Sequence, residues 1–201
     1  MTLSKLILAS ASPRRAEILH GAGYAFGVMS SAIDETPIPG ETAEAMVQRL
    51  ADAKAELVAA RSVGPAIVVA ADTAVRIGTQ ILGKPRTTED ARQMLQSLSG
   101  MTHSVITGVA LIRLPDVERR SFVEATQVHF SALTAEEIEE YLASGEPFDK
   151  AGGYAIQGRG GRFISRIEGC YFNVVGLPLA RLARALAELG YHAGMTEDGG
   201  L

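Results

Sequence analysis

The apolar run of residues 66–71 limits the choice of fold most. It is rich in valine and does not alternate between polar and apolar positions, which is the pattern of a central strand covered on both faces. Asp72 and Thr73 follow it directly. Ligands bind at the carboxyl ends of strands in open α/β sheets, so Asp72 is a candidate catalytic group in an α/β fold. An N-cap or turn aspartate is the alternative, but residues 75–77 continue as strand and make it less suitable. Asp72 is therefore expected at a bend or bulge within an extended segment.

A second apolar run, residues 6–9, leads into the segment SASPRR at residues 10–15. Ser12 before Pro13 is typical of a helix start, with a hydroxyl at the N-cap and proline at the first helical position. The following arginines then lie in the first turn, where the helix dipole is positive and an anion stabilises them. Two solvated surface arginines are an equally suitable interpretation of this segment alone. The functional interpretation is a phosphate site formed by Ser10, Ser12, Arg14 and Arg15.

Composition limits the class of protein and its partners. A chain of 201 residues, 47% hydrophobic and 21% charged, can bury one substantial core, so we expect a single domain over residues 1–201. The formal net charge of −4 argues against nucleic acid or an anionic membrane as partner and favours small anionic ligands in a local basic pocket. A single cysteine, and the lack of any signal-peptide pattern, predict a cytoplasmic location. The tail after about residue 194 is expected to be mobile.

Hydrophobic periodicity and turn residues predict the remaining elements. Two long β-rich segments around Pro115 predict an antiparallel hairpin, so the sheet is expected to be mixed, with helices flanking it. Thr134 and Glu137 form a capping box at the start of one helix. The expected helices begin near Thr42, Thr87 and Leu177, and the expected strands cover residues 24–29, 102–114, 118–130 and 162–167, with a turn at 168–173.

Residues 78–84 match G-x-x-x-x-G-K, but they do not form a P-loop. Pro85 stands where that motif needs Ser or Thr, so no hydroxyl is available for magnesium. Proline also favours an extended conformation at Lys84. What remains is Lys84 on a stiff turn shortly after Asp72, and a surface lysine is the alternative.

Residues 145–161 form a glycine-rich segment that lets backbone approach a ligand closely. A flexible connector is the alternative, but such a linker would lack Tyr154 and Ile156. A dinucleotide fingerprint is excluded, because the glycines follow no convincing strand and open no helix. The polar residues available to a ligand are Glu146, Asp149, Lys150 and Gln157.

Five separated motifs together resemble the Maf family of nucleoside triphosphate pyrophosphatases, once described as septum-formation inhibitors. They are residues 10–15, 71–73, 83–85, 103–109 and 149–158, and they occur in the family's order. The resemblance runs from about Leu6 to Leu189. It implies an elongated mixed α/β sheet flanked by helices, as in the inosine triphosphatase-like (Maf/Ham1) fold, a divalent cation, and a homodimer in many members.

Within the family, the pattern resembles the subgroup that acts on dTTP and UTP. The subgroup that hydrolyses 7-methyl-GTP has tryptophan in place of the first arginine of Ser-Pro-Arg-Arg. The positions that match the specificity residues are Arg14, Thr73 and Gln157, and all three have the dTTP/UTP form. The resemblance further implies that Asp72 is the proton acceptor.

The resulting hypothesis is hydrolysis between the α- and β-phosphates, which needs charge neutralisation and a positioned water. Asp72 and Glu35 would hold Mg²⁺ or Mn²⁺, and the Gln157 amide, with Thr73 beside it, would read a pyrimidine edge. A nucleotide-binding regulator of cell division without turnover, and a phosphatase acting on the γ-phosphate, are the alternatives. The expected triphosphate ligands are Ser10, Ser12, Arg14, Arg15 and Lys84, of which Arg15 and Lys84 are also candidate catalytic residues. Lys150 is a further candidate substrate-binding residue.

Overall fold

The computed structural model describes residues 4–194. The segment after about residue 194, which was expected to be mobile, lies beyond them. The strands are β1 (Lys5–Leu8), β2 (Gly27–Val28), β3 (Ala66–Ile77), β4 (Gln80–Leu82), β5 (Thr102–Leu114), β6 (Glu118–Phe130) and β7 (Ile164–Glu168). The α-helices are α1 (Pro13–Gly21), α2 (Ala43–Ala59), α3 (Thr88–Leu98), α4 (Ala135–Ala143), α5 (Tyr171–Val175) and α6 (Leu179–Glu188), and short 3-10 helices cover Glu146–Asp149, Ala151–Gly153 and Arg159–Phe163.

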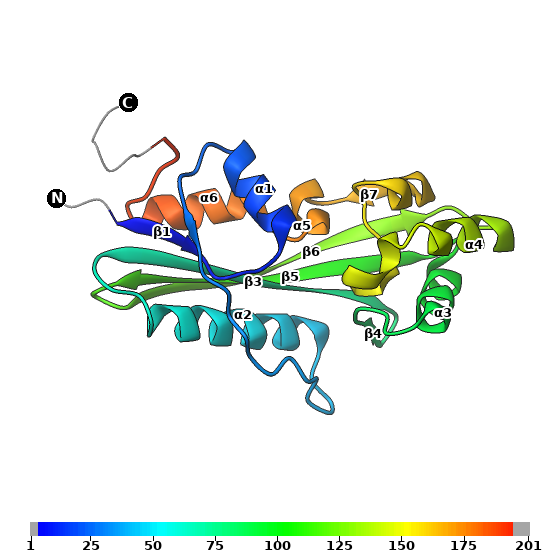
Figure 1. The fold of residues 1–201 in the computed structure, drawn as a ribbon, viewed down its shortest axis with the longest axis horizontal. Coiled ribbons are helices and arrows are strands. Elements are labelled where there is room, and N and C mark those ends of the chain that lie inside the picture. Colours follow the sequence, from blue (N-terminus) through cyan, green and yellow to red (C-terminus); the bar gives the residue numbers. More distant parts are fainter. Residues whose placement is uncertain (1–3, 195–201) are drawn as a thin grey trace. The chain divides into compact units, whose positions relative to one another are not determined.

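The strands form one mixed sheet in the order β2-β1-β3-β5-β6-β7, and β4 pairs with β3 off this path (Figure 1). β1 pairs in parallel with β2 and β3, and Leu8 lies opposite Val69. The pairs β3–β4 and β6–β7 are antiparallel. The prediction of a mixed α/β sheet with helices is therefore confirmed.

The chain groups into two compact units. Unit 1 comprises residues 1–72, 107–124 and 176–201, and unit 2 comprises residues 73–106 and 125–175. The strands β3, β5 and β6 each contribute one part to each unit. A single domain over residues 1–201 stays a prediction.

In unit 1, α2 lies on one side of β1 and β3, and α1 and α6 lie on the other (Figure 1). Small residues let α2 approach the sheet closely: a Cβ on Gly108 of β5 would lie 2.5 Å from the carbonyl carbon of Val47. Burial on both faces is why residues 66–71 of β3 are uniformly apolar. The core between α2 and the sheet contains Ala51, Ala55, Val58, Val68, Ala70, Ala110 and Ile112.

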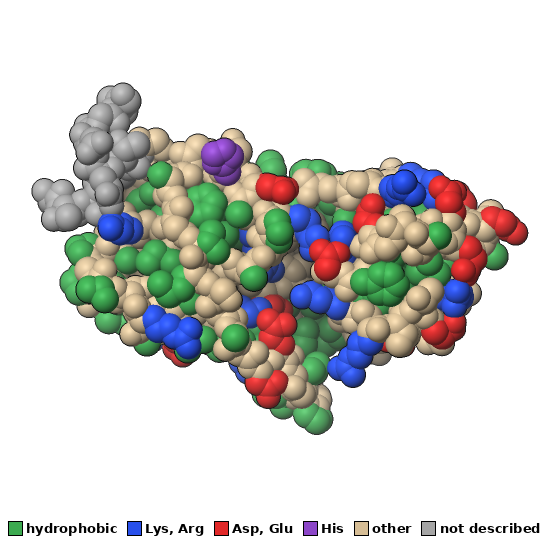
Figure 2. All heavy atoms as spheres, in the orientation of Figure 1, with side chains coloured by type: hydrophobic (Ala, Val, Ile, Leu, Met, Phe, Trp, Pro, Cys, Tyr) green, Lys and Arg blue, Asp and Glu red, His purple; other side chains and the backbone are tan. Residues whose placement is uncertain are grey.

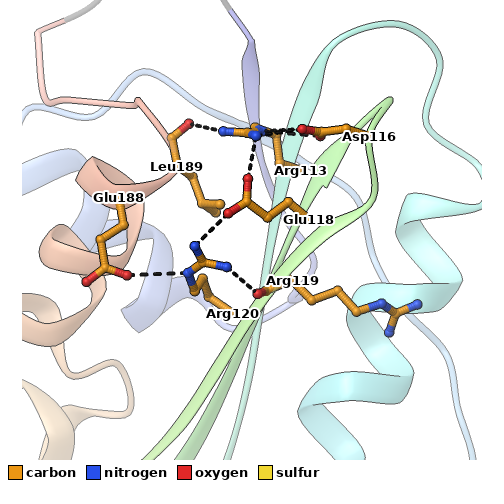
Figure 3. Close-up of polar contacts among 7 residues, drawn as sticks. All are labelled: Arg113, Asp116, Glu118, Arg119, Arg120, Glu188 and Leu189. Carbon is orange, nitrogen blue, oxygen red and sulfur yellow. Dashed lines mark hydrogen bonds and ion pairs between the residues drawn. The ribbon is translucent and has the colours of Figure 1, made fainter.

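A network of charged side chains joins the turn between β5 and β6 to the end of α6 (Figure 3). Arg113 pairs with Asp116 and Glu118, and its Nη1 donates to the Leu189 carbonyl at 3.2 Å. Arg120 continues the network by pairing with Glu118 on its own strand and with an α6 glutamate. The Arg120–Glu188 ion pair and the Arg113–Leu189 hydrogen bond connect the β5–β6 hairpin to the end of α6 within unit 1.

In unit 2, α3 and α4 pack on β5 and β6 around an apolar core. Tyr154 and Phe163 belong to this core, so the glycine-rich segment is an ordered part of unit 2 and not a flexible connector. Over the α3 and α4 region, Figure 2 shows acidic and basic side chains next to one another. Within unit 2, Arg92 of α3 forms ion pairs with Glu89 and Glu139. None of the helices within residues 4–194 is long and apolar enough to cross a bilayer.

Three local expectations differ from the structure. β3 runs without a bend through Asp72 to Ile77, because β4 pairs with residues 75–77 and extends the strand. The expected turn at residues 168–173 gives way at Tyr171 to α5. The strand expected over residues 24–29 is reduced to Gly27–Val28, the residues that pair with the end of β1.

Candidate active site

The turn from β1 into α1 carries the serines and arginines of the predicted phosphate site. Ser12 occupies the N-cap position with extended backbone, but its hydroxyl forms no capping hydrogen bond. The prediction of a hydroxyl cap at Ser12 is wrong in this respect. Instead, the Ser12 amide donates to Oγ of Ser10 at 3.2 Å, and Ser10 is buried. The hydroxyl of Ser10 therefore shapes the turn from inside.

The guanidinium of Arg15 connects α1 to two other segments of unit 1. Its Nη1 donates to the Ala71 carbonyl at 2.8 Å and to Oγ of Ser10 at 3.2 Å, and its Nε donates to the Gly176 carbonyl at 2.8 Å. The loss of water around it lowers the pKa of Arg15, and the negative charge of Asp72 opposes that effect. Arg15 thus fixes the backbone of β3 at the residue immediately before Asp72.

A lysine and two carboxylates form a compact charged group in unit 1. Nζ of Lys54 lies 2.6 Å from Oδ1 of Asp72 and 2.6 Å from Oε1 of Glu35. The side chains of Lys54 and Asp72 are only 8% and 13% exposed, whereas that of Glu35 is 52% exposed. An ammonium so deeply buried needs compensating negative charge, and the two carboxylates provide it. The lysine in turn holds both carboxylates at one place.

Lys54 is not among the site residues that the sequence predicts, because the helix from Thr42 carries none of the recognised motifs. The available signal was its position on the helix. The buried residues of α2 recur at 43, 46, 47, 50, 51, 54, 55 and 58, which is one face of a helix. Lys54 is the charged residue on that otherwise apolar face, and a charge at a core position indicates a specific partner.

Asp72 and Glu35 also fit the divalent ion that was predicted for them. Both carboxylates lie within contact of one cationic atom, Nζ of Lys54, and carboxylate oxygens suit Mg²⁺ or Mn²⁺ when waters and phosphate oxygens complete the coordination. Within residues 4–194, no group of three or more His, Cys, Asp and Glu side chains could hold a metal. The donor set matches an ion shared between protein and a phosphate ligand.

The other candidates lie in unit 2, where two of the motifs adjoin. The amide of Gly152 donates to the Gly83 carbonyl at 2.9 Å, which places the glycine-rich segment against the turn that carries Lys84. Lys84 and Gln157 are exposed. Nζ of Lys150 donates to the Glu146 carbonyl at 2.7 Å and pairs with Asp149. Thr73 follows Asp72 directly on β3 and is half-buried.

The described candidate residues thus form two groups, one in each unit, and contacts link the members within each group. In unit 1, hydrogen bonds and ion pairs join Ser10 to Arg15, Arg15 to the backbone beside Asp72, and Asp72 through Lys54 to Glu35. In unit 2, the turn of Lys84 meets the segment of Lys150 and Gln157. The protein is thus of the mixed α/β class, and the first group, which combines a helix start, cations and an acid pair, is its candidate phosphate site.

Comparison with known proteins identifies the family. The model described as "Maf-like protein" matches residues 5–189. A dTTP/UTP pyrophosphatase of Carboxydothermus hydrogenoformans is 49% identical over 187 residues, which cover 93% of this chain and 100% of the relative. A dTTP/UTP pyrophosphatase of Myxococcus xanthus is 51% identical over 92% of both chains. The chain belongs to the Maf family, as the five motifs predict.

The chain is also similar, at low identity, to solved structures. The nucleoside-triphosphatase / dITP/XTP pyrophosphatase of Mycobacterium abscessus aligns over 92% of this chain and 97% of its own, with 15% sequence identity and a TM-score of 0.41.

Proposed function

We propose that this protein hydrolyses dTTP and UTP to the nucleoside monophosphate and pyrophosphate, and so removes these or related nucleotides from the cellular pool. The close relatives that carry this activity in their names support the substrate class. The geometric observation that supports a reaction is the Asp72 carboxylate, held at 2.6 Å by the buried ammonium of Lys54. An acid fixed in this way can direct a water at a phosphorus atom.

Asp72 acts in this proposal as proton acceptor. Lys54 occupies Oδ1 of Asp72, and the carboxylate has a second oxygen with which to accept a proton from the attacking water. Arg15 holds the adjoining backbone at Ala71 and adds positive charge beside the turn that follows β1. Lys54 and Arg15 thereby orient the Asp72 carboxylate, the general base, before substrate binds. This orientation reduces the entropic cost of the reaction.

The remaining side chains bind and select the nucleotide. Ser10, Ser12 and Arg14 take the phosphates at the start of α1, where N–H groups and the helix dipole favour anions. Lys84 and Lys150 contribute further positive charge to the triphosphate. Gln157 and Thr73 recognise the pyrimidine base, since an amide offers both donors and acceptors to a base edge.

A divalent cation, Mg²⁺ or Mn²⁺, would be held by Asp72 and Glu35 together with phosphate oxygens. When bound, it supplies charge neutralisation and polarises the phosphate. Without a cation, two carboxylates would repel a bound triphosphate. Loss of activity on chelation with EDTA, restored by Mg²⁺ or Mn²⁺, is the expected result.

The acid pair also favours an enzyme over a regulator of division that only binds nucleotide. A binding protein gains nothing from carboxylates beside a phosphate site, because they weaken the binding of an anion. Asp72 and Glu35 are therefore better explained by turnover.

The deciding experiment is a product analysis. The purified protein is incubated with Mg²⁺ or Mn²⁺ and each of dTTP, UTP, CTP, dGTP and ATP, and the products are separated by ion-exchange chromatography. We expect monophosphate and pyrophosphate from dTTP and UTP. Release of orthophosphate would indicate attack at the γ-phosphate, and a preference for purines would contradict the proposed substrate class. Light scattering on the same sample tests the expected homodimer.

A further inference from the structure

The carboxylate of Glu146 lies at the centre of the glycine-rich segment of unit 2. Its Oε1 accepts hydrogen bonds from the Tyr141 hydroxyl at 2.9 Å and from the Gly160 amide at 3.1 Å. Its Oε2 accepts one from the Arg159 amide at 2.9 Å. One side chain therefore fixes two successive backbone N–H groups that lie 13 and 14 residues further along the chain. Hydrogen bonds to a charged acceptor are stronger than neutral ones.

The glycines on the far side of Gln157 are required by this arrangement. Gly158 has φ +88°, and a Cβ there would lie 2.9 Å from Oε2 of Glu146. A Cβ on Gly160 would lie 2.7 Å from the Ala155 carbonyl, and one on Gly161 would lie 2.5 Å from the Ile156 carbonyl. The chain thus folds back on residues 155 and 156 around the carboxylate, and the exposed Gln157 lies at the tip of a closed loop.

The backbone of Glu146 also contacts Lys150, another candidate substrate-binding residue. The Glu146 carbonyl accepts a hydrogen bond from Nζ of Lys150 at 2.7 Å. Burial pushes the pKa of the Glu146 carboxyl upward, but the amides of Arg159 and Gly160 and the Tyr141 hydroxyl hold it below its usual value. The carboxylate is therefore charged at neutral pH and keeps its full capacity as an acceptor.

We propose that Glu146 is a positioning residue for nucleotide specificity. It fixes the backbone on the carboxyl side of Gln157, so that the Gln157 amide is presented to the base in one orientation. Glu146 itself does not contact substrate in this proposal, and it acts through Gln157. The inference rests on the proposed function, because it takes Gln157 to be the residue that recognises the base.

A double-mutant cycle tests the coupling between the two residues. Steady-state kinetics with dTTP and UTP are measured for wild type, Glu146→Gln, Gln157→Ala and the double variant. The glutamine is isosteric, but it lacks the charge and places an NH₂ group against hydrogen-bond donors. We expect Glu146→Gln to raise KM about tenfold and to change kcat less than about threefold, which is the signature of lost binding. Once Gln157 is absent, Glu146→Gln should raise KM by no more than about twofold.

Two further measurements separate positioning from general destabilisation. Hydrogen exchange should show faster exchange of the Arg159 and Gly160 amides in Glu146→Gln, with α3 and α4 unchanged. The matched control is Glu139→Gln, which removes an exposed glutamate of α4 that pairs with Arg92 and should leave KM and kcat at the wild-type values. If Glu146→Gln does not fold, Glu146→Asp retains the charge at a shorter reach and should give an intermediate KM.

The proposal would be overturned if Glu146→Gln and Gln157→Ala raised KM independently, so that their effects multiplied in the double variant. An equal loss of kcat on every nucleotide would also overturn it. The proposed function fails separately, if wild type releases no pyrophosphate from either pyrimidine nucleotide. In that case the same variants are compared by their dissociation constants for the nucleotides that wild type binds. Equal constants for wild type and Glu146→Gln would then reject the positioning role.

Discussion

At the scale of single residues, the acid at position 72 is defined by its neighbours in unit 1. Arg15 bonds the carbonyl immediately before it, and Lys54 bonds the carboxylate itself. Both contacts involve side chains that cost free energy to bury, and these partners offset part of that cost. The site of Asp72 is thus organised before any ligand binds, and the residues that organise it come from α1 and α2.

Asp72→Asn should abolish turnover and preserve the fold. The amide is nearly the same size as the carboxylate but cannot accept a proton, so we expect kcat to fall by about 10²–10⁴-fold, the usual contribution of a general base. Pyrophosphate release and the circular dichroism spectrum are the measurements. Asp116→Asn, an exposed aspartate in the β5–β6 turn, is the control and should keep wild-type activity. Residual activity of Asp72→Asn above about one tenth of wild type would remove Asp72 from the catalytic role.

Lys54→Met should impair both activity and stability. The substitution keeps an apolar stem of similar length and leaves the carboxylates of Asp72 and Glu35 facing each other without their shared cation. We expect the free energy of unfolding to fall by roughly 1–3 kcal/mol, less than for a fully buried pair because Glu35 is half exposed, and kcat to fall at least about tenfold. Urea denaturation and steady-state kinetics measure the two effects. Lys54→Arg retains the charge and should recover part of both losses. Unchanged kinetics in Lys54→Met would show that the ion pair serves the fold alone.

At the scale of elements, the close approach of α2 to β5 determines where Lys54 lies. The approach depends on Gly108, since any Cβ there would meet the backbone of α2 at Val47 and Gln48. Backbone atoms within a helix cannot move aside as a flexible side chain can. A displaced α2 would also move Lys54, because the helix is rigid over its length.

Gly108→Ala should therefore destabilise unit 1 and lower activity together. We expect a loss of roughly 3 kcal/mol in the free energy of unfolding, at the upper end of what overpacking costs, and a fall in kcat. Thermal denaturation and the pyrophosphate assay measure these effects. Gly21→Ala, at the end of α1 where an added Cβ meets nothing within 4 Å, should be neutral. Wild-type stability for Gly108→Ala would mean that α2 does not depend on this contact.

The elements that sequence predicts well are those specified by neighbouring residues. The hairpin strands over residues 102–114 and 118–130 agree with the prediction because a proline turn and β-branched runs define them locally. The capping box of α4 forms both of its hydrogen bonds, at Thr134 and Glu137. The strand over residues 75–77 was predicted, but the straight course of β3 through Asp72 was not, because it depends on pairing with β4.

The same distinction applies to the candidate site. Residues in contiguous motifs, such as Ser10 and Asp72, are recognisable from the sequence. Lys54 was not predicted, and Glu146 was predicted only as a polar residue available to a ligand, because their roles arise from partners distant in the chain. Lys54 meets an acid 18 residues away, and Glu146 meets amides 13 and 14 residues away. Such contacts can be identified only once the fold is known.

At the scale of the whole molecule, the pH dependence of stability has one identifiable source in the core of unit 2. His103 of β5 is only 2% exposed, its Nε2 is hydrogen-bonded to the Tyr154 hydroxyl at 2.6 Å, and its ring packs edge-on against Phe130. Burial, with a smaller effect from His129, lowers the pKa of His103 to about 4. The histidine is therefore neutral in the folded protein at pH 5–7.

Acidification should destabilise the wild type through this residue. An unfolded histidine has a pKa of about 6.5, so between about pH 6.5 and 4 the unfolded chain binds more protons than the folded one, and stability falls as pH falls. Between pH 7 and pH 5, the protonation of His103 on unfolding should lower the free energy of unfolding by roughly 2 kcal/mol. We expect His103→Gln to be less stable at pH 7 but to lose roughly 2 kcal/mol less than wild type between these pH values, as measured by urea denaturation. His192→Gln, an exposed histidine, should retain the wild-type dependence. An identical pH dependence in His103→Gln would show that other groups cause the acid sensitivity.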